Sequence, residues 1–245
     1  MTWTTARATA SRVLRQLRHD PRTVILLIVV PIVLLVLVRY AFDANPEVFQ
    51  RTGLPLVGIF PLVSMFLVAS IAMLRERRSG TLERLMALPT AKGGLLIGYA
   101  AAFGVVAVVQ ALGVLAVAVG PLGLRVVGPL WMAVVVAIVN ALLGMSMGLF
   151  FSAFAQTEFQ AIQFMPAFIL PQLLLCGLLV ARSAMARPLE VASTVLPMTY
   201  AYDALRLVAG DAQPGGALIV DVLVTSAMGA CALFAGAMTL PRRTP

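Results

Sequence analysis

The sequence predicts an all-α integral membrane protein with six transmembrane helices. Of its 245 residues, 61% are hydrophobic and only 11% are charged, whereas a soluble domain carries about 25% charged residues. The chain contains six long apolar runs. A membrane span needs roughly 20 apolar residues in a helix, because a helix forms all its backbone hydrogen bonds internally in the hydrocarbon layer. The runs lack the alternation of a barrel wall. We expect one transmembrane domain over residues 1–245.

The first element, residues 1–22, is predicted to be an amphipathic helix at the membrane surface. Its apolar side holds Trp3, Ala6, Ala10, Val13, Leu14 and Leu17, and its other side holds Arg7, Arg12, Arg15, Arg18 and Arg22. A basic amphipathic helix with tryptophan lies in the plane of the lipid headgroups. A disordered basic tail is the alternative. Asp20-Pro21 then breaks this helix and turns the chain into the membrane.

The six spans follow. They are approximately Thr23–Phe42, Leu54–Leu74, Leu95–Val119, Val127–Phe151, Phe164–Val180 and Ala217–Leu240, which places spans in the segments 23–74, 93–180 and 217–245. The fifth run is the shortest and contains Pro166 and Pro171, so we expect a kink or a break there. Cys176 and Cys231 lie inside apolar runs without CxxC spacing, so both are expected to be buried and unpaired.

The distribution of basic residues predicts the orientation. If the N-terminus is cytoplasmic, twelve lysine and arginine residues lie in inside segments and six in outside segments. Cytoplasmic loops carry the excess of basic residues, so both termini are expected in the cytoplasm and the protein in the plasma membrane. The inside loop Ser152–Gln163 has no basic residue and does not contribute to this bias. Contact with membrane lipid, rather than with nucleic acid, explains the net charge of +8, because the basic residues cluster at the ends of apolar runs.

The segment 75–92, which begins RERRSGTLERLMALP, is a compact charged stretch between the second and third spans. Thr81 can cap a short helix, Glu83 lies in its first turn where the helix dipole favours an anion, and Pro89 ends it. Leu82, Leu85 and Met86 share one face of this helix. A solvated loop would explain the charges but not the cap, the apolar face and the stop. We therefore expect a helix over Thr81–Leu88 that docks a soluble partner.

The segment 181–216 precedes the last span and is long for an unstructured connection. A helix is expected from Pro197 to Val208, with an Asp203–Arg206 ion pair at i, i+3. The side chains expected on one side of it are Met198, Ala201, Tyr202, Leu205 and Val208.

Catalytic and cofactor motifs are missing from the sequence. It has no GxxxxGK[ST] loop for nucleotide phosphates, no HExxH, and one histidine, His19. The pentad 144–148, GMSMG, matches GxSxG, but a nucleophile elbow needs a strand-turn-helix and a histidine base. Gly144 and Gly148 are instead expected to bring two helices close together. We expect no catalytic residue, metal or cofactor in this chain.

The predicted spans contain few polar groups. Asp221 lies about one turn into the sixth span, and the large amides are Gln110, Asn140, Gln163 and Gln172. Hydrogen bonding between helices is the ordinary role of such amides, and lining a substrate path is the alternative. A coupled transporter needs ionisable groups near the middle of the bilayer, so the energy source is expected outside this chain.

The charged segment resembles the signature E-x-x-x-G-T-L-E-x-L-x-x-x-P of ABC-2 type exporter permeases, close to the daunorubicin-resistance branch. The matching residues are Glu76, the run from Gly80 to Leu85, and Pro89. The resemblance implies a coupling helix that inserts into a cleft of a cytoplasmic ATPase subunit, which binds the ATP and magnesium. The coupling residues it implies are Glu76, Gly80, Thr81, Leu82, Glu83, Arg84 and Leu85, with Glu158 in a second, smaller contact. It further implies that Tyr202, Asp203 and Arg206 belong to an extracellular gate, for which an interfacial loop helix is the alternative.

The expected function is that of a membrane permease subunit working by alternating access, with a second permease copy or paralogue and separate ATPase subunits. An apolar path with a few amides suits an amphipathic drug, antibiotic or lipid. Export of a glycan or lipid-linked precursor by the same fold is one alternative, and a membrane scaffold without transport is another.

Overall fold

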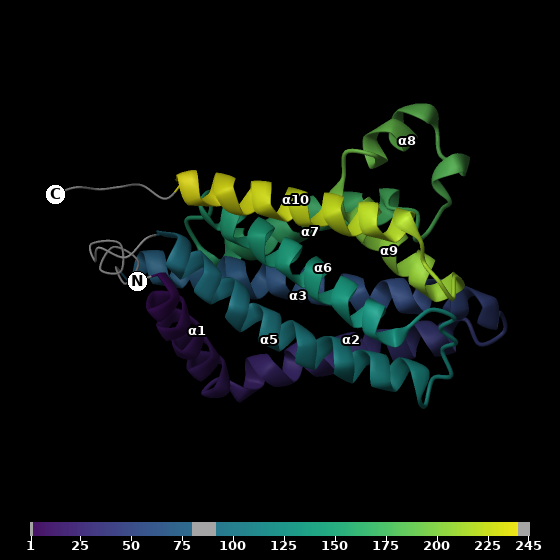
Figure 1. Ribbon diagram of the computed structural model, residues 1–245, viewed down its shortest axis with the longest axis horizontal. Helices are drawn as coiled ribbons and strands as arrows, with labels where there is room; N and C mark the ends of the chain where they lie inside the picture. Colours follow the sequence, from purple (N-terminus) through teal and green to yellow (C-terminus); the bar gives the residue numbers. More distant parts are fainter. Residues whose placement is uncertain (1, 80–91, 240–245) are drawn as a thin grey trace.

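The computed structural model describes residues 2–79 and 92–239, and those residues form helices without a strand (Figure 1). The helices are α1 (Thr2–Arg18), α2 (Pro21–Ala41), α3 (Pro46–Arg78), α5 (Lys92–Val119), α6 (Leu130–Ser152), α7 (Glu158–Leu175), the 3₁₀ turn η1 (Arg182–Ala184), α8 (Arg187–Ser193), α9 (Pro197–Gly210) and α10 (Gly216–Thr239). The prediction of an all-helical protein is confirmed.

Among the described residues, five helices are long and apolar enough to cross a membrane: α2, α3, α5 from Gly93, α6 and α10. They correspond to the first, second, third, fourth and sixth predicted spans. The second runs further than expected, because α3 begins at Pro46 rather than Leu54 and continues to Arg78. Its 33 residues make a helix of roughly 50 Å, at 1.5 Å per residue, which exceeds the thickness of the hydrocarbon core.

The fifth predicted span, Phe164–Val180, differs from the structure. Helix α7 begins earlier, at Glu158, where Thr157 caps it by accepting a hydrogen bond from the Gln160 amide at 3.2 Å. The helix continues through both prolines, so of the expected kink or break the break does not occur, and it ends at Leu175. It stops there because Gly177 adopts a φ of 103°, a left-handed conformation that ends an α-helix.

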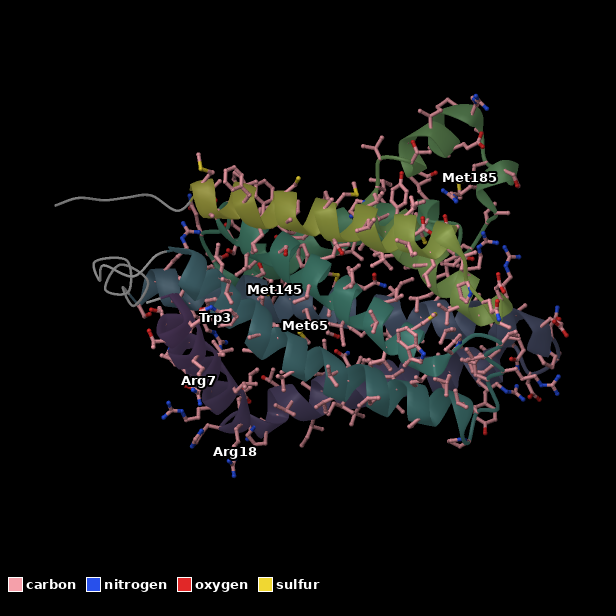
Figure 2. All side chains as sticks on the ribbon, viewed as in Figure 1. Trp3, Arg7, Arg18, Met65, Met145 and Met185 are labelled. Carbon is pink, nitrogen blue, oxygen red and sulfur yellow. The ribbon has the colours of Figure 1, made fainter. Side chains whose placement is uncertain are left out.

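Helices α3 and α6 form the centre of the bundle. In the most apolar 18-residue stretch of each helix, 56% of the residues of α3 and 61% of those of α6 are buried. The corresponding value is 17% for each of the peripheral helices α2 and α10. Met65 and Met145 lie in the core between them (Figure 2). Cys176 is buried as expected, but Cys231 is exposed because it lies on the outward face of peripheral α10.

The glycines of the GxSxG pentad lie at the closest contact between α3 and α6. A Cβ atom at Gly144 would lie 2.0 Å from the Leu62 carbonyl oxygen, and one at Gly148 would lie 2.3 Å from that of Phe66. Ser146 donates a hydrogen bond to the Leu142 carbonyl of its own helix at 2.7 Å. The packing interpretation of the pentad is therefore confirmed.

Helix α1 packs against α5 through buried Ala6 and Val13 of its predicted apolar face and through buried Thr9 beside them. Trp3 does not join this contact and is 79% exposed, while Arg7 and Arg18 point away from the bundle (Figure 2). The chain turns after Arg18, as expected, because Asp20 caps α2 by accepting a hydrogen bond from the Thr23 amide at 3.2 Å.

The two ends of the bundle differ. Helix α1, the last turn of α3 and the first turn of α5 lie together at the end we call the α1 end, on the left in Figure 1. Helices α8 and α9 and the first turn of α10 lie at the opposite end, which we call the α9 end. The predicted helix Pro197–Val208 corresponds to α9, and all five side chains expected on one side of it are buried.

Candidate functional site

The last turn of α3, residues 75–79, leads directly into the segment predicted to couple to a partner. Three of its side chains each contact a different element of the bundle. Glu76 contacts α1, Arg75 contacts α7, and Arg77 contacts the end of α6. The base of the charged segment is therefore attached to three helices that are distant in sequence.

The contact with α1 is a buried ion pair. Arg12 Nη1 donates to Glu76 Oε1 at 2.5 Å, and Glu76 is only 7% exposed. The hydroxyl of buried Tyr99 on α5 lies beside this pair. The Glu76 carboxylate is thus largely shielded from water, whereas the Arg12 side chain is 28% exposed. A buried carboxylate needs its partner to offset the loss of hydration.

The contact with α7 is exposed and bidentate. Arg75 donates from Nε and Nη2 to the two carboxylate oxygens of Glu158, at 2.9 Å and 3.1 Å. The hydrogen bonds from Arg75 hold the pKa of Glu158 below its usual value. Alongside, Arg77 Nη1 donates to the Ser152 carbonyl at 2.6 Å, satisfying an acceptor at the C-terminal end of α6.

The coupling residues implied by the resemblance are only partly described. Glu76 lies in the last turn of α3 and faces the interior, and Glu158 of α7 is paired with Arg75 of the same turn. The remaining six, Gly80, Thr81, Leu82, Glu83, Arg84 and Leu85, lie outside the described residues, as does the predicted helix Thr81–Leu88.

Sequence reasoning missed the partners Arg12, Arg75, Arg77 and Ser152. Each contact joins residues 64 to 83 positions apart, and a single sequence holds no signal for such pairings. Arg12 was expected only on the polar side of the N-terminal helix, and Arg75 and Arg77 only as charges of the segment 75–92.

Three of the four candidate path amides are buried in contacts between helices. Gln110 donates to Ser64 Oγ at 3.0 Å, and Gln172 accepts from the Met198 amide at 3.3 Å. Asn140 Nδ2 lies 3.5 Å from the carbonyls of Gly58 and Ala201, so it sits between α3, α6 and α9. Gln163 is exposed on α7. The four amides therefore come from three helices, α5, α6 and α7, and each of the three buried ones contacts another helix.

The three candidate gate residues lie on α9 beside a cavity of about 440 Å³ at the α9 end. The expected Asp203–Arg206 ion pair is present, with Arg206 Nε 3.5 Å from Asp203 Oδ1. Asp203 also binds Arg182, which follows α7. Burial raises the pKa of Asp203, and both guanidinium groups oppose that shift.

The ABC-2 type transporter family matches residues 5–209, from α1 to the end of α9. The chain belongs to the ABC-2 type transporter family. Members of this family are membrane subunits that lack the ATPase motif and associate with an ABC ATPase subunit. Together with the apolar helices, the family match makes the chain a multi-pass membrane protein of an ABC transporter.

Two curated relatives of this ABC-2 chain are named "Probable multidrug ABC transporter permease YbhR", from Escherichia coli strain K12 and from Escherichia coli O157:H7. Each is 29% identical over 122 residues, which is 50% of this chain and 33% of the relative. The match spans about a third of the length of these relatives, so it supports the family and leaves the substrate open.

Proposed function

We propose that this chain is the permease subunit of an ATP-driven exporter, powered by a separate cytoplasmic ATPase through the segment 75–92. The observation that carries the proposal is the attachment of the last turn of α3 to three helices, α1, α6 and α7. A force applied to the residues that follow Ser79 would reach all three helices at once. A solvated loop needs no such attachment.

Six crossings, as in a half-transporter, are part of this proposal. Helix α6 ends beside Arg77 at the α1 end, and Arg182 binds Asp203 at the α9 end, so the chain returns across the bundle through α7. Helix α7 exposes Phe159, Ile162, Leu170 and Leu174, and lipid would cover such a surface in a membrane. With six spans, both termini lie on one side, for which the basic residues favour the cytoplasm.

A working unit would contain a second permease copy or paralogue, and the ATPase subunits would bind ATP and magnesium. The substrate class that we propose is an amphipathic drug, antibiotic or lipid, moved outward by alternating access. A drug substrate agrees with the name of the YbhR relatives, which describes a multidrug ABC transporter permease. The daunorubicin-resistance branch remains part of this proposal.

The experiment is an ATPase assay in proteoliposomes. The purified chain alone should hydrolyse no ATP above background, and its ABC ATPase partner should add activity that an amphipathic substrate stimulates. Turnover by the isolated chain, free of the partner, would refute the proposal. An ATPase partner whose rate of ATP hydrolysis changes with neither the chain nor the substrate would refute it as well.

A further inference from the structure

We propose that the cavity at the α9 end binds the phosphate head group of an anionic amphiphile. The cavity, of about 440 Å³, is lined by guanidinium groups from three separate elements: Arg51 of α3, Arg182 of η1 and Arg206 of α9. Two carboxylates, Asp203 and Glu190, also line it. Positive charge is therefore in excess, and the proposal does not depend on the energy source or direction of transport.

Most hydrogen-bond donors of these arginines remain available to a ligand. Asp203 binds Arg182 and accepts from Arg206 Nε, but each guanidinium carries five N–H donors. Glu190 lies 3.5 Å from Arg187, on its own helix. No carboxylate of the described residues lies within ion-pair distance of Arg51, whose side chain is exposed. Its positive charge can thus serve an anion in the cavity.

Tyr202 provides an independent observation. This side chain lines the cavity and is only 2% exposed, yet its hydroxyl is buried without a hydrogen-bond partner among the described residues. The Arg51 guanidinium lies near enough to act on the Tyr202 hydroxyl oxygen as a hydrogen-bond donor as well as through its charge. Because arginine has no acceptor, the hydroxyl proton is still without a partner. A buried hydroxyl without a partner is unfavourable, and an anionic oxygen placed between Tyr202 and Arg51 would accept its proton.

The surroundings of the cavity indicate that the anion carries an apolar chain. Residues adjacent in sequence to the cavity lining are large, apolar and exposed: Val180 at 50%, Leu189 at 48%, Val191 at 55% and Val195 at 68%. They belong to the lobe around α8, which stands away from the bundle and carries Met185 (Figures 1 and 2). Such a surface beside a charged cavity suits a molecule with an apolar tail and a charged head.

A phosphate suits three arginines better than a carboxylate does. Arginine binds either anion through two parallel hydrogen bonds, but a phosphate monoester offers three free oxygens to guanidinium groups that approach from three elements. A zwitterionic head group would bring its own cation into an excess of positive charge. We therefore assign the cavity to an anionic phosphate amphiphile.

The test is a calorimetric titration of the purified full chain in maltoside micelles. The probes are dihexanoyl phosphatidate, dihexanoyl phosphatidylcholine and inorganic phosphate, each corrected by titration into protein-free micelles. We expect saturable binding of phosphatidate alone. Loss of one charge-assisted hydrogen bond should weaken binding about tenfold, so Arg51→Gln and Arg206→Gln should each raise the Kd by at least that factor. Tyr202→Phe should also raise it.

Arg125→Gln is the matched control, because it removes one exposed arginine from the same end of the bundle without touching the cavity. Its Kd for phosphatidate should equal that of the wild type. Equal binding by all variants would overturn the site. Equal affinity for phosphatidylcholine would overturn the anionic head group, and equal affinity for inorganic phosphate would overturn the amphiphile.

Discussion

At the scale of single residues, the Arg12–Glu76 pair shows how a charge can be kept in an apolar bundle. Glu76 is part of the family signature and was expected among the coupling residues, as the anchor of the approach to the helix; it is 7% exposed and binds α1. Its buried position makes it a link between the N-terminal helix and the base of the charged segment. The sequence showed a charged residue at this position but not whether its side chain faces the bundle or the outside.

Removing the arginine of this pair should destabilise the protein. Arg12→Met leaves the Glu76 carboxylate buried without its partner, and an unsatisfied buried polar group costs about 1–3 kcal/mol. The thermal unfolding midpoint in detergent should therefore fall. Arg7→Met, which changes an exposed arginine on the same helix, should leave the midpoint unchanged.

The double variant Arg12→Met, Glu76→Met separates a lost charge pair from lost packing. It removes both charges, and apolar replacement of a buried pair is often neutral. The midpoint should recover most of the loss seen in Arg12→Met. A double variant less stable than the single one would show that packing, not the unpaired carboxylate, caused the loss.

At the scale of elements, hydrophobic runs predicted where helices form, but local geometry decided where they end. The prolines of α7 gave no break. The helix ends at Leu175, five residues before the predicted end of the span at Val180, because Gly177 adopts a φ of 103°. Helix α3 exceeded its apolar run because charged residues at both ends can extend a helix into water. An apolar run indicates the part of a helix that is buried in lipid; it does not give the full length of the helix.

The contact between α3 and α6 yields a test at this scale. Gly144→Ala should force the helices apart, because the added Cβ would lie 2.0 Å from the Leu62 carbonyl oxygen, an atom of the backbone. Overpacking of this kind costs about 1–3 kcal/mol, measured as a lower unfolding midpoint. Gly104→Ala on α5 is the control, since a Cβ there meets nothing within 4 Å and alanine favours a helix. Equal effects of the two changes would contradict the close contact.

At the scale of the whole molecule, composition and the long apolar runs were enough to predict a helical membrane protein. They also located the five helices that are long and apolar enough to cross a membrane among the described residues, which match the first four predicted spans and the last. The local pair Asp203–Arg206 was predicted and is present, but the ion pairs at the α1 end and the approach of Arg51 and Arg182 to the cavity at the α9 end could not be predicted. Arg182 and Asp203 lie 21 residues apart, and Arg75 and Glu158 lie 83 apart. Such contacts depend on how the helices pack, and no short pattern in one sequence encodes that arrangement.

The proposed orientation can be measured by cysteine labelling in intact cells. In a background without Cys176 and Cys231, a cysteine replacing Ala44, exposed between α2 and α3, should react with an impermeant maleimide. A cysteine replacing His19, exposed between α1 and α2 at the other end, should react only after permeabilisation. The opposite pattern would place both termini outside.

The most direct test of the central claim measures substrate efflux and substrate-stimulated ATP hydrolysis together, with the chain and its ATPase partner in proteoliposomes. The variant is Gly80→Val, Glu83→Ala, and the control is Arg125→Gln, at the opposite end of the bundle. Loss of the Glu83 charge costs about 0.3–1 kcal/mol at a helix start, so membrane insertion should persist. We predict that both activities fall together in the double variant and persist in the control. A well-inserted double variant that exports at the wild-type rate would contradict coupling through this segment.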